Sequence, residues 1–218
     1  MNILKEIENC WLELEQNNLT GRILKTDEGL ALKSDNPLET PIRLDFDATL
    51  NHHQRFFMKS GLTKELLFKA CGRNKELVIR DITCGLGGDS LLLLAMGFKV
   101  RSMERHPLVK ILLYDAYERM SHPLKALWEL DFHSGEITED VLLFDPMFHG
   151  ENQKSLPQKE MRIFRDLIGA DGDQEVVGRG LLKVGRRLVV KRPRLAPLLL
   201  EKPAIQFKGK SIRYDVYL

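Results

Sequence analysis

Residues 81–89 read Asp-Ile-Thr-Cys-Gly-Leu-Gly-Gly-Asp and follow a short apolar segment that predicts a β-strand. Glycines where a strand gives way to a helix let the backbone turn sharply and approach a ligand, and the helix N-terminus offers free N–H groups. A dinucleotide-binding loop requires G-x-G-x-x-G, but counting from Gly85 the last position is Ser90. An acid on the first strand instead suits a cofactor with a cationic amino-acid tail and no pyrophosphate. We therefore predict a cofactor loop that includes Asp81, Gly85 and Gly87; the alternative is a glycine-rich turn without a ligand.

After this loop, short apolar segments alternate with helix-like segments, as in a parallel sheet built from βαβ units. The predicted strands of the sheet are residues 77–83, 99–104, 127–132, 141–145 and 187–191. Helices are predicted between them, including 107–120, where Pro107 suits the first turn, and 158–168. Residues 204–207 and 212–217 predict an antiparallel hairpin at the end of the chain. The pattern predicts an α/β fold with a mostly parallel, doubly wound sheet.

The N-terminal part of the chain has a different pattern. Ile3, Ile7, Trp11 and Leu14 have the spacing of an amphipathic helix. Short strands are predicted at 22–25, 30–33 and 42–46, and a helix at 51–71 that Gly72 ends. We predict a small α+β extension, residues 1–50, followed by the main domain, residues 51–218.

Length and composition narrow the class of protein. The 218 residues are 43% hydrophobic and 29% charged, as in a globular protein. No apolar run reaches the length of a membrane span, and the N-terminus lacks the pattern of a secretory signal, so we expect a cytoplasmic protein. The three cysteines form no C-x-x-C pair, and neither a disulfide framework nor a metal site is predicted.

Positive charge is concentrated near the C-terminus. Residues 178–213 contain eleven Lys or Arg and a single acid, Glu201, although the net charge of the whole chain is only +2. A basic surface attracts polyanions through phosphate contacts and counterion release, so nucleic acid is a candidate partner. The alternative is a solvated charged face with no ligand.

Glu104 ends the second predicted strand of the sheet, 23 positions after Asp81. An acid at about this spacing reaches the ribose hydroxyls of a nucleoside cofactor. Two carboxylate oxygens can accept both hydroxyl protons. The alternative for Glu104 is an exposed acid at the end of a strand.

Asp145-Pro146-Met147-Phe148 directly follows the apolar run 141–144, at the carboxyl end of a predicted strand, where open α/β sheets bind ligands. Methyltransferases that act on planar amino groups carry an Asp/Asn-Pro-Pro-aromatic tetrapeptide at this place, and this tetrapeptide is similar. We predict that the Asp145 carboxylate and the Pro146 carbonyl accept hydrogen bonds from the two N–H groups of an amine. Phe148 is predicted to stack on the base that carries this amine. The alternative is a turn started by Asp-Pro, with Phe148 in the core.

Three separated motifs resemble the ribosomal RNA small subunit methyltransferase J family. They are 145–148, Lys159-Glu160-Met161-Arg162-Ile163-Phe164-Arg165-Asp166-Leu167-Ile168-Gly169, and Leu188-Val189-Val190-Lys191-Arg192-Pro193. A weaker resemblance extends over 24–45 and 81–105. The resemblance implies a Rossmann-like class I methyltransferase that uses S-adenosylmethionine to methylate N2 of a guanine in small-subunit (16S) rRNA. Free rRNA and the assembled small subunit are both possible substrates.

The same resemblance implies further site residues. Cofactor contacts fall on Gly88, Asp89, Glu104, Arg105, His133, Ser134 and Asp145. Gly88 stands where the family has an arginine, so only its backbone can make that contact, and the family has two serines where this chain has His133-Ser134. Asp131 is a candidate to share the role of that pair.

Lys191, Arg192 and Arg194 follow a predicted strand at the same sheet edge as Asp145, and we predict that they contact RNA phosphates.

Other functions stay open at this point. The tetrapeptide would equally suit an enzyme that methylates adenine N6 in nucleic acid or a protein glutamine. A protein of another class could keep the fold and bind RNA without catalysis; binding of S-adenosylhomocysteine would argue against it. A nicotinamide dehydrogenase lacks its third glycine.

Overall fold

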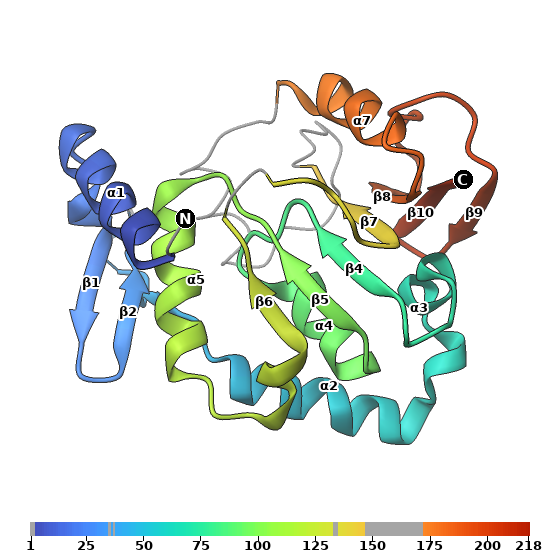
Figure 1. Ribbon diagram of the computed structural model, residues 1–218. Coiled ribbons are helices and arrows are strands. Elements are labelled where there is room, and N and C mark those ends of the chain that lie inside the picture. The colour runs from blue at the N-terminus through green and yellow to red at the C-terminus, as the bar shows by residue number, and fades with distance from the viewer. Residues whose placement is uncertain (1–2, 35, 37, 133–134, 147–171) are drawn as a thin grey trace.

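The computed structural model describes residues 3–34, 36, 38–132, 135–146 and 172–218. At its centre is a seven-stranded sheet with the order β6-β5-β4-β7-β8-β10-β9 (Figure 1). The strands are β4 (Val78–Asp81), β5 (Lys99–Ser102), β6 (Trp128–Leu130), β7 (Val141–Phe144), β8 (Arg187–Pro193), β9 (Ile205–Lys208) and β10 (Ile212–Tyr217). The five strands from β4 to β8 are parallel, and the hairpin β9–β10 is antiparallel. This confirms the predicted doubly wound sheet and its closing hairpin.

Helices cover both faces of the sheet. They are α2 (Phe46–Ser60), α3 (Leu66–Cys71), α4 (Gly88–Met96), α5 (Pro107–Arg119) and α7 (Gln174–Leu182), with 3-10 turns η2 (Leu62–Lys64) and η3 (Pro123–Leu127). Side chains alternate along each strand, so Leu143 and Val189 join the core with α2, α3 and α4. Leu142 and Leu188 point the other way and pack with Leu181 of α7. Burial on both faces explains the continuous apolar runs in the sequence. None of the helices in the described ranges is long and apolar enough to cross a membrane.

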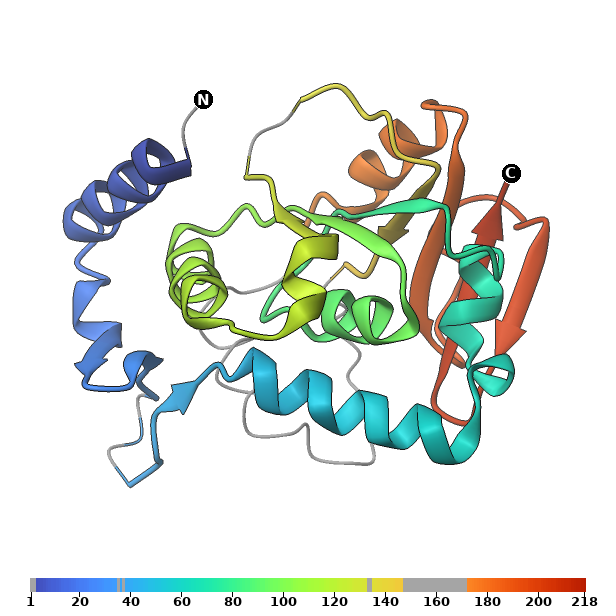
Figure 2. The ribbon, with the colours of Figure 1, turned by 60° about the horizontal axis from the view of Figure 1, so that its bottom comes forward.

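The N-terminal elements form a separate small layer. Helix α1 (Ile3–Gln16) and the turn η1 (Thr20–Arg22) precede a three-stranded antiparallel sheet of β1 (Ile23–Thr26), β2 (Gly29–Leu32) and β3 (Ile42–Arg43). Both views show this layer at the β6 end of the molecule, beside α5 (Figures 1 and 2). Leu14 and Leu32 pack there against Leu108 and Leu112 of α5. Helix α5 is therefore buried on two sides, which explains why every residue from Leu108 to Leu113 is buried.

Two predicted elements near the N-terminus are wrong in detail. The helix predicted at 51–71 is two helices, because Gly61 has a φ of +76° and ends α2. The strand predicted at 42–46 stops at Arg43, because the Asp45 carboxylate accepts the Ala48 N–H and begins α2 at Phe46. Helix α2 then runs alongside α4 (Figure 2). The predicted helix 158–168 lies outside the described residues, and α7 was not predicted.

One face of β4, β5 and β6 carries charged residues in register. Arg80 on β4 lies beside Arg101 on β5, which lies beside Glu129 on β6. The Arg80 guanidinium is 1% exposed and makes two hydrogen bonds of 2.8 and 2.9 Å to the Glu139 carboxylate, which also accepts from Arg101. Glu139 therefore ties the segment that precedes β7 to this face.

Candidate functional site

The loop between β4 and α4 has the glycine conformations expected of a close backbone approach. Gly85 has a φ of +55° and Gly87 a φ of +87°, in the left-handed region that favours glycine. Helix α4 starts at Gly88, with Gly87 as its N-cap. A Cβ atom at Gly88 would meet nothing within 4 Å among the described residues. The first turn of α4 thus offers backbone N–H groups at the carboxyl edge of the sheet.

Asp81, predicted as a cofactor contact, lies beneath this loop. Its carboxylate is buried and accepts the Ser90 hydroxyl at 2.6 Å and the Thr83 N–H at 3.2 Å. Ser90 also contacts the Ser102 hydroxyl, to which the Trp128 indole donates. Asp81 therefore fixes the loop and the start of α4 from below. Burial raises the pKa of Asp81 to about 7, although the Ser90 hydrogen bond lowers it.

Replacing Asp81 by asparagine should make stability less dependent on pH. The pKa of Asp81 in the folded state lies above its ordinary value of 3.8, so its stabilising contribution is present at low pH and is lost as pH rises towards 7. Between about pH 4 and 7, urea denaturation should show a smaller fall in unfolding free energy for Asp81→Asn than for the wild type. Equal pH slopes would contradict this account of Asp81.

Glu104 stands just beyond β5, beside the glycine loop. Its Oε2 accepts the Gly85 N–H at 2.9 Å, and its Oε1 accepts the N–H groups of Arg105 and His106 at 2.8 Å. Burial raises the pKa of Glu104, while these three hydrogen bonds lower it. Arg105 is exposed, and its guanidinium pairs with Asp173 at 2.8 Å. The Glu104 carboxylate is therefore held in a defined orientation next to the glycine loop.

Asp145 and Pro146 follow β7 at the carboxyl edge of the sheet, and β7 is the neighbour of β4. The Asp145 N–H donates to the Thr83 hydroxyl at 2.7 Å, which joins the end of β7 to the glycine loop. This edge, between β4 and β7, is the point where the strand order reverses and where such sheets bind ligands.

The Lys191 side chain links the first turn of α4 to the end of β7. The Lys191 ammonium lies 2.7 Å from Oδ2 of Asp89 on α4 and 2.8 Å from Oδ2 of Asp145. Strand β8 is the parallel neighbour of β7, so Lys191 reaches Asp145 from the adjacent strand. Asp89 and Asp145 were predicted site residues, and the structure brings them together through one ammonium group.

The predicted phosphate-binding residues occupy different places. Lys191 lies within the site, between the two carboxylates. Arg192 is buried, with its guanidinium near Gln174 and the Pro197 carbonyl. Arg194 is exposed at the sheet edge and donates to the Gly209 carbonyl. Of the three, Arg194 is therefore the exposed one, whereas Arg192 is buried and Lys191 is held between two carboxylates.

Several predicted site residues lie outside the described residues. These are Met147, Phe148, His133, Ser134 and the motif 159–169. Asp131, which precedes the pair 133–134, lies 3.5 Å from Arg80.

Comparisons with known proteins fit this geometry. A family model described as "Putative SAM-dependent methyltransferase" matches residues 6–218. A curated relative from Pseudoalteromonas translucida, named ribosomal RNA small subunit methyltransferase J, is 38% identical over 210 residues, which cover 88% of this chain and 82% of the relative. The protein of the same name from Aliivibrio salmonicida is 34% identical, over 99% of this chain and 92% of the relative. This chain belongs to the ribosomal RNA small subunit methyltransferase J family.

A solved structure supports the fold and the class of enzyme. The crystal structure of a SAM-dependent methyltransferase from Neisseria gonorrhoeae matches with a TM-score of 0.64 and 27% identity, over 90% of this chain and 81% of that one. The resemblance, the Rossmann-like class I fold and the cofactor predicted from the sequence are thus confirmed. The protein is an S-adenosylmethionine-dependent methyltransferase.

The groups at the site of this methyltransferase suit its cofactor. The carboxylates of Asp89 and Asp145 can take a cationic amino group, and the first turn of α4 can take a carboxylate. Oε2 of Glu104 accepts one hydrogen bond from the described residues, so it keeps a lone pair for a ribose hydroxyl. The residues present therefore fit S-adenosylmethionine.

Sequence reasoning missed Thr83, Ser90 and the site position of Lys191 in this methyltransferase J family member. Thr83 and Ser90 flank the glycine loop, and their hydroxyls were a local signal. Lys191 directly follows three buried strand residues, 188–190. This pattern indicates the carboxyl end of a buried strand, at the sheet edge where Asp145 lies.

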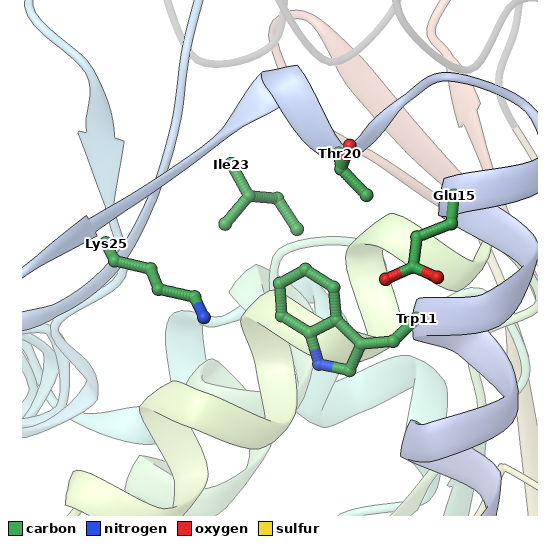
Figure 3. A pocket seen from close by; sticks show the side chains of 5 residues that line it. All are labelled: Trp11, Glu15, Thr20, Ile23 and Lys25. Atoms are coloured by element: carbon green, nitrogen blue, oxygen red, sulfur yellow. The ribbon is translucent and has the colours of Figure 1, made fainter.

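A shallow pocket of about 540 Å³ lies elsewhere, in the N-terminal layer (Figure 3). It is lined by Trp11, Glu15, Thr20, Ile23 and Lys25, and the Lys25 ammonium lies 5.5 Å from the centre of the Trp11 ring. These residues come from α1, η1 and β1, so the pocket contains no predicted site residue.

Proposed function

We propose that this methyltransferase transfers a methyl group to the exocyclic N2 amine of a guanine in small-subunit (16S) rRNA. The observation that carries the proposal is the position of Asp145-Pro146, next to the glycine loop at the reversal point of the sheet. Relatives named ribosomal RNA small subunit methyltransferase J support RNA as the substrate class. An rRNA substrate places the activity in the cytoplasm.

The chemistry needs groups that activate a poor nucleophile. The lone pair of an exocyclic amine is delocalised into the ring, so the amine must be polarised before it attacks. The Asp145 carboxylate and the Pro146 carbonyl accept hydrogen bonds from the two N–H groups of the amine. These hydrogen bonds direct the amine lone pair at the methyl group. S-adenosylmethionine, when bound, supplies an electrophilic methyl group. As the nitrogen–carbon bond forms, the carbon–sulfur bond breaks, and Asp145 accepts the proton that the amine loses.

The cofactor contacts are proposed from both sides of the glycine loop. Asp89 and Asp145 bind its amino-acid end, and Glu104 accepts from its ribose. Gly85, Gly87 and Gly88 let the backbone approach, with Asp81 holding the loop from below. The family resemblance adds Arg105 and the pair His133-Ser134, while Phe148 is proposed to stack on the guanine. A base inside a helix cannot reach this edge, so the target is unpaired or flipped out.

Exposed cations near the site offer a phosphate-binding edge, which we define as Arg194, Lys208 and Lys210. Arg194 donates to the carbonyl of Gly209, which places all three residues at the turn of the β9–β10 hairpin. This turn lies beside Pro193, at the end of the strand that carries Lys191. The edge is therefore close enough to the site to hold RNA on it.

Replacing the three residues of this edge by glutamine should weaken RNA binding without changing the chemistry. We expect a lower affinity for small-subunit rRNA and a fall of about 2 in the slope of log affinity against log salt concentration. Binding titrations at several salt concentrations measure both. The double variant Lys75→Gln/Lys99→Gln, with both lysines exposed and Lys99 at the amino end of β5, is the control. The same salt slope in both variants would contradict this assignment.

Labelled S-adenosylmethionine tests the proposed substrate. The protein is incubated with small subunits and with deproteinised rRNA, both from cells that lack the activity, and label is followed into RNA and protein fractions. We expect label in RNA. Label in ribosomal protein alone would show a glutamine or other protein target and overturn the proposal.

A further inference from the structure

Lys191 is the feature of the site that the proposed chemistry has not used. It extends from β8 to a point between α4 and the end of β7, with its ammonium within 2.8 Å of a carboxylate on each side. Its side chain is 21% exposed, and the Asp89 and Asp145 side chains are 19% and 36% exposed. A lysine that mainly attracted RNA phosphates would extend into solvent. This one faces the reaction site.

The contacts leave Asp145 able to react. Lys191 pairs with Oδ2 of Asp145, so a substrate amine can approach Oδ1. The Asp145 backbone is separately held by its hydrogen bond to Thr83. The two contacts together fix both the position and the orientation of the carboxylate.

Within the described residues, charged and titratable groups on neighbouring elements act on this bridge, including Cys71 on α3, which interacts with Asp89. Asp81 on β4 and Asp89 on α4 add negative charge, and Arg192 on β8 adds positive charge. Tyr214 on β10 is the cross-strand partner of Lys191, and His53 on α2 interacts electrostatically with Asp89. Burial lowers the pKa of His53, which keeps that imidazole mainly neutral near pH 7.

The charge balance favours the ion pair. Burial alone would lower the pKa of Lys191, but the carboxylates of Asp145 and Asp89 outweigh it and raise the pKa well above its usual value. Burial raises the pKa of Asp145, Lys191 lowers it, and Asp89 raises it. Without Lys191, two neighbouring carboxylates would face each other, and Asp145 would more readily take up a proton.

The geometry points to Lys191 as a positioning residue of the transfer reaction: its ammonium keeps the Asp145 carboxylate charged and oriented, and ties it to Asp89 on the cofactor side. This role rests on the proposed function, because only a reaction that uses the Asp145 carboxylate requires it. Lys191 acts through Asp145 and does not itself touch the amine.

The first test needs neither RNA nor cofactor. The protein is labelled with carbon-13 aspartate, and the Asp145 carboxyl signal is identified by its loss in Asp145→Asn. We expect its titration midpoint to rise in Lys191→Met and to fall in Asp89→Asn, where Lys191 keeps Asp145 as its remaining carboxylate partner. Lys99→Met, at the opposite edge of the sheet, should leave the midpoint unchanged. An unchanged midpoint in Asp89→Asn and in Lys191→Met overturns the role, and the Asp89 variant decides alone if Lys191→Met does not fold.

The second test follows kcat against pH with the labelled RNA assay. Lys191→Met should lower kcat at pH 6.5 by about 10- to 100-fold and less at pH 8.5, because Asp145 regains its charge as pH rises. Lys191→Arg keeps the positive charge and should recover most of the lost rate. A loss in Lys191→Met that is equal at both pH values contradicts the role. Failure of the wild type to methylate RNA would refute the proposed function, whereas the carboxyl titration would still decide the role of Lys191.

Discussion

Replacing Asp145 by alanine should lower kcat for methyl transfer by about 10²- to 10⁴-fold. The variant loses the carboxylate that accepts one N–H of the amine and takes its proton, while the Pro146 carbonyl remains. Asp145→Asn keeps an oxygen acceptor in place but removes the charge, so its loss should be smaller. Single-turnover assays with saturating RNA measure the chemical step directly.

Two controls make the Asp145 result specific. Asp27→Ala removes an exposed carboxylate in the turn between β1 and β2 and should not change kcat. Calorimetric titration with S-adenosylhomocysteine should show that Asp145→Ala loses less cofactor affinity than rate. If rate and affinity fall by the same factor, Asp145 serves the cofactor and not the amine, and the catalytic role assigned to it is refuted.

Replacing Glu139 by alanine should lower the free energy of unfolding by about 3–5 kcal/mol. Glu139 makes two hydrogen bonds to Arg80, whose side chain is 1% exposed, so the variant leaves a buried guanidinium without its main partner. Asp131, at 3.5 Å, compensates only in part. Urea denaturation followed by tryptophan fluorescence measures the change.

Glu129→Ala is the matched control for Glu139→Ala. Glu129 also pairs with an arginine on this face, Arg101, but its side chain is 60% exposed. An exposed pair contributes little, so this variant should cost no more than about 1 kcal/mol. Similar decreases in the free energy of unfolding of the two variants would show that burial does not determine how much these ion pairs stabilise the fold.

Local pattern predicted most of the sheet. The apolar runs at 141–144 and 188–190 are buried on both faces, and such runs are readable from sequence alone. The glycines at 85 and 87 and the Asp-Pro pair also lie where predicted, because strand-to-helix turns and strand ends carry local signals.

Residues whose role depends on distant partners were harder to predict. The sequence pattern puts Lys191 at the same sheet edge as Asp145, but nothing nearby in sequence shows that its ammonium bridges Asp145 and Asp89 instead of facing solvent. Arg213 belongs to the basic stretch 178–213, but it is buried against Asp215 and the carbonyls of the preceding loop. Charge counting cannot separate cations that organise the fold from cations that face solvent.

The break at Gly61 was a different kind of error. The apolar spacing of 51–71 continues through this glycine, so periodicity alone predicts a single helix. In the structure a φ of +76° at Gly61 lets the chain turn from α2 into η2. One residue with a positive φ thus ends a helix within an apolar pattern that continues over residues 51–71.

The identity of the methylated nucleoside tests the central claim most directly. Small-subunit RNA from cells that lack the activity is labelled with the protein and methyl-labelled S-adenosylmethionine, digested to nucleosides, and separated against standards. We predict that all transferred label migrates with N2-methylguanosine. Label in N6-methyladenosine, or in any nucleoside other than N2-methylguanosine, would contradict the account.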